Sequence, residues 1–133
     1  MYLKMKKRLA LVIGSILLSV MACLASPPES ILTAIKTGNA DKLSEFFDNN
    51  VDLKILDKEN IYSKSQATIL VKEFFTNYKI TNLELNHEGG PDNARFAICN
   101  LNTVQGKFRV YFLFKTVNGK SLIQKFRIEK DGQ

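Results

Sequence analysis

The residues that could do chemistry in this chain are few and widely spaced. The 133-residue sequence has one histidine, His87, and two cysteines, Cys23 and Cys99. A metal site needs clustered His, Cys, Asp or Glu ligands, and a nucleophilic triad needs a histidine held beside a serine or cysteine. His87 ends an alternating segment next to Gly89-Gly90, where a solvated rim residue is the usual occupant. We therefore expect no metal ion, no cofactor and no Ser-His-Asp set.

The remaining reactive side chains also favour a structural interpretation. Cys99 lies within an apolar, strand-like run, which is typical of a small buried hydrophobic residue. Glu84 and Glu129 lie near the ends of strand-like segments, where a surface charge is the default. The chain has no glycine motif that would cradle a phosphate. An enzyme with an atypical site, built from Tyr62 or Tyr111 with a lysine or arginine, stays open as an alternative.

Two short helices are expected to begin the folded part. Apolar residues recur at helical spacing from residue 31 to the break at Gly38. Asn39 can then cap a second helix, because its side-chain oxygen can accept a hydrogen bond from an unpaired amide of the first turn. This second helix is expected to place Phe46 and Phe47 on its apolar face and to end at residues 49–50.

A strand, a long helix and a run of further strands follow. Residues 51–55 alternate between apolar and charged, residues 57–60 predict a turn, and Ser63 with Gln66 has the spacing of a capping box. The helix after it has one apolar stripe: Ala67, Leu70, Val71, Phe74 and Tyr78. From residue 79 the period changes to two, with strands expected at 82–87, 94–103, 108–116 and 121–129. Helices followed by a meander predict an α+β fold, with helices on one face of a curved antiparallel sheet.

The register of the last hairpin decides which side chains line the interior. Asn118-Gly119 favours a two-residue turn, which would place Lys125, Arg127 and Glu129 inside as a polar lining. The alternative register needs a bulge or an odd loop, and it places Leu122, Phe126 and Ile128 inside with Gln124 as the single polar interruption. We predict the second register, because a one-residue slip would expose the apolar face. Tyr62, Gln124 and Arg127 are the candidate pocket or rim residues.

The N-terminus has the features of an export signal. Four basic residues precede an uncharged apolar run from residue 9 to residue 22, which is short for a membrane span and ends in small residues. We expect residues 1–25 to be a cleaved signal peptide and residues 26–133 to form a single domain in the periplasm or outside the cell. Residues 20–23 also resemble a lipobox, although Met21 departs from it. Lipidation of Cys23 would instead tether the protein to a membrane.

The net charge argues against a nucleic-acid partner. The whole chain has a formal charge of +6, but residues 26–133 hold 15 Lys and Arg against 13 Asp and Glu. These charges are interleaved along the chain, whereas a nucleic-acid-binding surface gathers basic residues. The partners left open are a small molecule, a protein of the cell envelope or a second copy of this chain.

Several segments resemble a known family. Ser30 to Phe47 with its Gly-Asn break, the run from Asp57 to Lys64, and the pair 108–113 and 122–130 are similar to small exported proteins of Bacteroidetes-type bacteria, grouped as domain of unknown function 4783. That family is similar in plan to the nuclear transport factor 2-like superfamily, in which a bent sheet wraps over helices to form an open cone. The resemblance implies a fold and a compartment, and it carries no established activity.

The superfamily includes isomerases, dehydratases and hydrolases that place a carboxylate or an imidazole inside the cone as the catalytic base. This chain has no Asp or Glu in the middle of its strands between residues 94 and 128. We therefore expect a non-catalytic module that binds a small amphiphile or an envelope protein, with a homodimeric assembly domain as the alternative. A filled cone with an apolar outer face would favour assembly, and a pocket would favour a ligand.

Overall fold

The structure is a computed structural model that describes residues 27–132, so the expected signal peptide and Cys23 lie outside the described residues. The elements, in chain order, are α2 (Glu29–Lys36), α3 (Ala40–Ser44), β1 (Phe47–Ile55), β2 (Lys58–Ser63), α4 (Lys64–Asn77), β3 (Ile80–Gly89), β4 (Arg95–Thr103), β5 (Gly106–Val117) and β6 (Lys120–Lys130). Within this part of the chain, no helix has the length and apolar character needed to cross a lipid bilayer.

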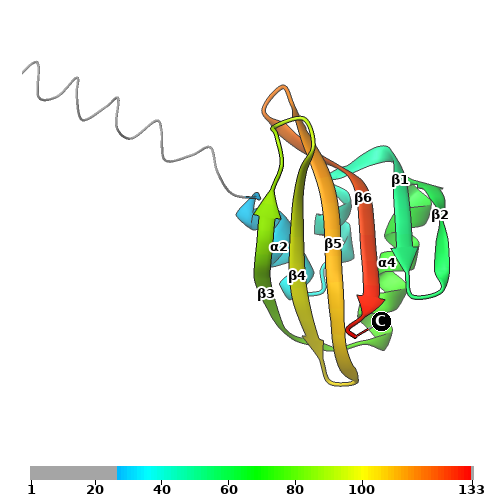
Figure 1. Cartoon of the computed structure of the whole chain (residues 1–133). Coiled ribbons are helices and arrows are strands. Elements are labelled where there is room, and N and C mark those ends of the chain that lie inside the picture. Colours follow the sequence, from blue (N-terminus) through cyan, green and yellow to red (C-terminus); the bar gives the residue numbers. More distant parts are fainter. Residues whose placement is uncertain (1–26, 133) are drawn as a thin grey trace, which may run out of the picture.

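The strands form one bent sheet in the order β2-β1-β6-β5-β4-β3, and the helices lie against one of its faces (Figure 1). This arrangement confirms the α+β prediction. The sheet is not wholly antiparallel, however, because β1 runs parallel to β6 while every other neighbouring pair is antiparallel. Local alternation of residue types predicts a strand but contains no information about its direction relative to its neighbours.

The second helix begins where expected and ends early. The Oδ1 atom of Asn39 accepts a hydrogen bond from the Lys42 amide at 3.1 Å, which caps α3. The prediction that this helix continues through Phe47 is wrong, because Phe47 opens β1 and residues 49–50 lie inside that strand. The Phe47 ring packs edge-on against Phe126 of β6, with 6.0 Å between ring centroids. Burial against the sheet outweighs the local helical period.

The long helix α4 has the predicted cap and the predicted stripe. The Ser63 hydroxyl accepts a hydrogen bond from the Gln66 amide at 3.3 Å. Val71 and Phe74 are buried in the core, whereas Tyr78 at the C-terminal end of the helix is only partly covered. The Tyr78 ring stacks on Phe74 with centroids 4.6 Å apart, so the last turn of α4 is anchored while one side of the tyrosine stays accessible.

The β5–β6 hairpin has the predicted register through most of its length. Arg109 pairs with Glu129, and Tyr111 pairs with Arg127, on the face of the sheet away from the helices. Phe126 is fully buried on the other face. The prediction that burial decides the register is confirmed.

The hairpin also keeps its preferred turn, because a β-bulge absorbs the difference. Asn118 and Gly119 both have positive φ, 52° and 75°, as a two-residue hairpin turn of this kind requires. Between this turn and the rest of the strand the register shifts by one residue at Gln124. Ile123, not Leu122, therefore faces the core on the turn side of the bulge, which corrects the predicted face of β6 there.

Apolar side chains fill the space between sheet and helices. Phe47, Phe112 and Phe126 are the largest fully buried side chains. Among residues 27–132, no polar or charged side chain is buried. The interior of the cone is therefore a packed core, and any ligand site must lie at its mouth or on its surface.

Candidate functional site

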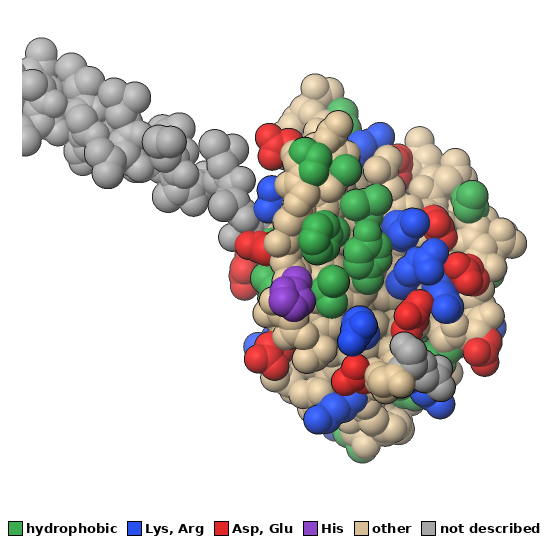
Figure 2. Space-filling model, viewed as in Figure 1, with side chains coloured by type: hydrophobic (Ala, Val, Ile, Leu, Met, Phe, Trp, Pro, Cys, Tyr) green, Lys and Arg blue, Asp and Glu red, His purple; other side chains and the backbone are tan. Residues whose placement is uncertain are grey.

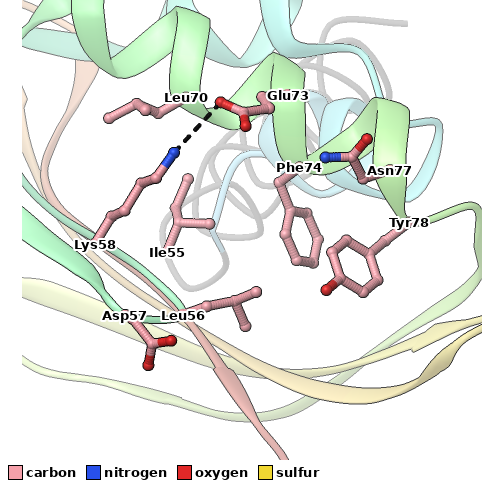
Figure 3. A pocket seen from close by; sticks show the side chains of 9 residues that line it. All are labelled: Ile55, Leu56, Asp57, Lys58, Leu70, Glu73, Phe74, Asn77 and Tyr78. Carbon is pink, nitrogen blue, oxygen red and sulfur yellow. Dashed lines mark ion pairs between the residues drawn. The ribbon is translucent and has the colours of Figure 1, made fainter.

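An apolar hollow lies at the mouth of the cone, between the last turns of α4 and the tight turn that joins β1 to β2. Its volume is about 240 Å³. Figure 3 shows Ile55, Leu56, Phe74 and Tyr78 converging on it from the two elements. Leu70 completes the apolar wall. The hollow can thus take up an apolar group without any change in the core beneath it.

Polar groups stand only around the edge of this hollow. Lys58 and Glu73 form an ion pair across it, with 3.6 Å between Nζ and Oε2 (Figure 3). Both side chains are more than half exposed, so the pair adds little stability and can open. The Asn77 side chain lies beside Tyr78 at the end of α4. Amide and hydroxyl groups at such an edge can orient the polar end of a bound molecule.

A second, polar depression of about 730 Å³ adjoins the apolar hollow. The two share Leu56, Asp57 and Tyr78. Lys54 and Glu129 lie in the depression as an ion pair at 3.1 Å. The mouth of the cone therefore places an apolar site and a polar site side by side, with Leu56 and Tyr78 between them.

Leu56 is held in a backbone conformation that leucine rarely adopts. Its φ is 56°, in the left-handed region, and its amide donates a hydrogen bond to the Ile128 carbonyl at 2.9 Å. A residue with a Cβ is strained there by about 1–2 kcal/mol, and Gly, Asn or Asp normally occupies such a turn. The turn is formed by Leu56-Asp57, and β2 already begins at Lys58, so the predicted turn over 57–60 is displaced. The strained leucine presents an apolar side chain to both depressions.

The side chains with the greatest chemical reactivity, a thiol and an imidazole, lie apart from this mouth. Cys99 is fully buried in β4, and burial raises the pKa of its thiol from 9.0 to about 11, as expected of a structural cysteine. His87 is exposed on β3. The described residues hold no cluster of three or more His, Cys, Asp or Glu side chains that could bind a metal ion.

The three residues that the sequence suggested as pocket or rim residues lie apart from one another in the structure. Tyr62 lies on β2 and packs against the edge of the core. Gln124 occupies the bulge of β6. Arg127 lies on the outer face of the sheet, with its Nη2 atom 3.2 Å from Glu59. None of the three lines the mouth hollow or the adjoining polar depression.

The residues that line the mouth could not be recognised as a set from the sequence. Leu56 and Tyr78 are separated by α4, and they meet only because that helix folds back over the β1–β2 turn. One sequence signal pointed to this position: Leu56 and Asp57 form a turn between two strands, and neither residue is a glycine. Tyr78 itself was predicted to lie on the core stripe of α4.

Known proteins resemble the chain over most of its length. The family model "Domain of unknown function (DUF4783)" matches residues 28–129. Crystal structures of DUF4783 proteins from Bacteroides ovatus and Bacteroides uniformis are each 34% identical, with TM-scores of 0.75. The alignments cover 80% and 81% of this chain, and 97% and 100% of those chains.

A more distant similarity identifies the wider fold. The protein Rd1NTF2_05 is 18% identical with a TM-score of 0.62, and the match covers 75% of this chain and 90% of that chain. No curated protein matches the chain. The fold is the nuclear transport factor 2-like cone, and the chain belongs to the DUF4783 family.

Proposed function

We propose that the protein is an exported, non-catalytic module that holds a small amphiphile at the mouth of the cone. The observation that carries the proposal is the contact between an apolar hollow and a polar depression, which share Leu56, Asp57 and Tyr78. An amphiphile has the same division into apolar and polar parts. The basic and apolar N-terminal segment supports export, with cleavage after Ala25 or lipidation at Cys23.

The volume of the hollow limits the size of the apolar part of the ligand. A methylene group takes up about as much space as a water molecule, roughly 30 Å³, so 240 Å³ accommodates about eight carbon atoms. This corresponds to a medium-length alkyl chain or one aromatic ring. A long acyl chain would need a tunnel into the core, which Phe112 and Phe126 fill.

The charges around the polar depression favour a head group without a strong net charge. Lys54 is paired with Glu129, and Glu59 is paired with Arg127 of the outer face, which leaves Lys130 and Asp57 as one further charge of each sign around the depression. A strongly anionic or cationic head would break this balance. An uncharged head can accept or donate hydrogen bonds at the Tyr78 hydroxyl and the Asn77 amide without displacing an ion pair.

Calorimetric titration with alkyl glucosides below their critical micelle concentrations tests the proposal. Octyl glucoside is expected to bind about fifteenfold more tightly than hexyl glucoside, since two methylenes contribute about 1.6 kcal/mol. Decyl glucoside is expected to gain little more, because the hollow is then full. A glucoside series in which affinity rises evenly from hexyl to decyl would contradict a site of this size.

A matched pair of variants on α4 locates the binding site. Leu70→Trp places a larger side chain in the hollow and is expected to abolish octyl glucoside binding. Ile69→Trp puts the same side chain on a neighbouring position that is 65% exposed, outside the hollow, and is expected to leave binding unchanged. Equal affinities in both variants, or no binding by the unaltered protein, would overturn the proposal.

A further inference from the structure

The side chain of Gln105, in the turn between β4 and β5, is bonded to the short connection between α4 and β3. Its Nε2 atom donates a hydrogen bond to the Asn77 carbonyl at 2.9 Å, and its Oε1 atom accepts one from the Lys79 amide at 3.2 Å. These partners lie 28 and 26 positions away in the chain, and Figure 1 shows the turn and the end of α4 at the same end of the molecule. We call this pair of bonds the Gln105 clamp. The residue between its two attachment points is Tyr78.

The clamp continues the β3–β4 ladder past its last residue pair. On this side the ladder ends where Ile80 pairs with Thr103. One residue further, the Val104 amide donates a hydrogen bond to the Lys79 carbonyl at 2.9 Å. The side-chain amide of Gln105 then supplies a donor and an acceptor, as a backbone peptide group would in a longer strand. The connection is therefore hydrogen-bonded on both sides of the tyrosine that it contains.

Hydrogen bonds within the turn orient Gln105 towards the helix. The Gln105 amide donates a hydrogen bond to the Thr103 Oγ1 atom at 3.2 Å, and the Thr103 hydroxyl donates one to the Gly106 carbonyl at 2.9 Å. Apolar contacts contribute little at the tip of the turn, because Val104 is 67% exposed. Figure 2 shows the hydrophobic side chains of this face of the sheet gathered over its middle, away from this end. The conformation of the turn thus depends on hydrogen bonds.

Tyr78 stands between the two depressions at the mouth, and its backbone is what the clamp restrains. Its ring stacks on Phe74 with centroids 4.6 Å apart and meets Phe108 edge-on at 5.0 Å. Its φ and ψ of −122° and 106° are extended, so helical hydrogen bonds no longer restrain the chain beyond it. The carbonyls of a last helical turn lack partners within the helix, and Gln105 provides one for Asn77. The clamp thus fixes the backbone from which the tyrosine ring projects.

We propose that Gln105 is a positioning residue of the mouth site, which holds the Tyr78 hydroxyl where it can bind the head group of the ligand. The inference rests on the ligand site proposed above, and it adds a residue that lines neither of the two depressions. A hydroxyl that is already held in place loses less conformational entropy on binding than one that must be ordered. Loss of the clamp therefore weakens binding of the head group and leaves the apolar hollow in place.

Amide hydrogen exchange followed by nuclear magnetic resonance tests the clamp without a ligand. Gln105→Met keeps the length of the side chain and removes both hydrogen-bonding groups, so the Lys79 amide is expected to exchange about tenfold faster. The ring signals of Tyr78, which are assigned by their loss in Tyr78→Phe, are expected to move because the ring shifts against its two phenylalanine neighbours. Val104→Thr is the matched control in the same turn, and it is expected to leave both measurements unchanged.

A double-mutant cycle connects the clamp to ligand binding. Gln105→Met is expected to weaken octyl glucoside binding about fivefold, as measured by calorimetric titration. In the Tyr78→Phe background the same change is expected to weaken binding less than about twofold, because the hydroxyl that Gln105 positions is then absent. An effect of Gln105 on the fold as a whole would weaken binding by the same factor in both backgrounds.

The two experiments separate the failure of the clamp from the failure of the ligand site. Unchanged exchange of the Lys79 amide, or unmoved Tyr78 ring signals, in Gln105→Met would overturn the inference. Equal weakening of octyl glucoside binding in both backgrounds would overturn it as well. If the unaltered protein does not bind octyl glucoside, the proposed function is wrong, whereas the exchange rates and ring signals still decide whether Gln105 positions Tyr78.

Discussion

Deletion of Gln124 is the sharpest test of how the hairpin reconciles its turn with its core. Leu113 pairs with Lys125 and Phe114 pairs with Ile123, so Gln124 is the one residue of β6 without a counterpart. Removing it joins the two registers into a regular ladder. Every remaining side chain between the bulge and the turn keeps its face, because Ile123 and Phe126 still point inward and Lys125 still points outward.

The expected cost of this deletion is modest. Ile123 donates a backbone hydrogen bond to the Phe46 carbonyl, at 2.6 Å, and the deletion draws this residue about 3.4 Å along the strand. Loss of that bond, and of the extra twist that a bulge provides, is expected to lower the free energy of unfolding by about 1–2 kcal/mol. Urea unfolding followed by far-ultraviolet circular dichroism measures this difference.

Deletion of Leu113 from the opposite strand is the matched control. It removes one residue at the same level of the hairpin, but it moves Phe114 from the core to the outer face and Lys115 towards the core. Phe114 is 2% exposed, and losing its burial alone costs about 1.5–3 kcal/mol, before the charge is counted. We expect a loss of at least about 4 kcal/mol or no folded protein. If the Gln124 deletion destabilises as much as the Leu113 deletion, the bulge does not have the role inferred here.

Two further predictions concern single positions. At residue 56, Leu56→Gly is expected to be more stable than Leu56→Ala by about 1 kcal/mol, because glycine adopts the positive φ without strain. Urea unfolding of the two variants measures this order. The reverse order would mean that the turn relaxes to another backbone conformation. The buried Cys99 thiol has its pKa raised from 9.0 to about 11, so the folded state holds this proton more tightly than the unfolded state. Its stabilising contribution is complete below pH 9 and decreases as the pH rises towards 11, by up to about 1.4 kcal/mol per pH unit, and a Cys99→Ala variant should lack this part of the slope. Identical slopes in the two proteins would show that the thiol ionises freely in the fold.

The elements in which local chemistry and burial agree could be predicted from the amino-acid sequence. The Asn39 cap, the Ser63 cap and the apolar stripe of α4 depend on residues within a few positions of one another. The register of the β5–β6 hairpin was also predictable, since exposing Phe112 and Phe126 would destabilise the fold by more than a preferred turn stabilises it. Cys99 was correctly placed in the core for the same reason.

Contacts between segments distant in the chain fixed the features that the local pattern left open. Phe47 suits a helix or a strand, and its contact with Phe126 selects the strand. The parallel direction of β1 beside β6, the position of the bulge at Gln124 and the meeting of Leu56 with Tyr78 all arise where separate segments are brought together. Periodicity reports which face of an element is apolar, whereas the identity of the element that covers that face is a property of the whole fold.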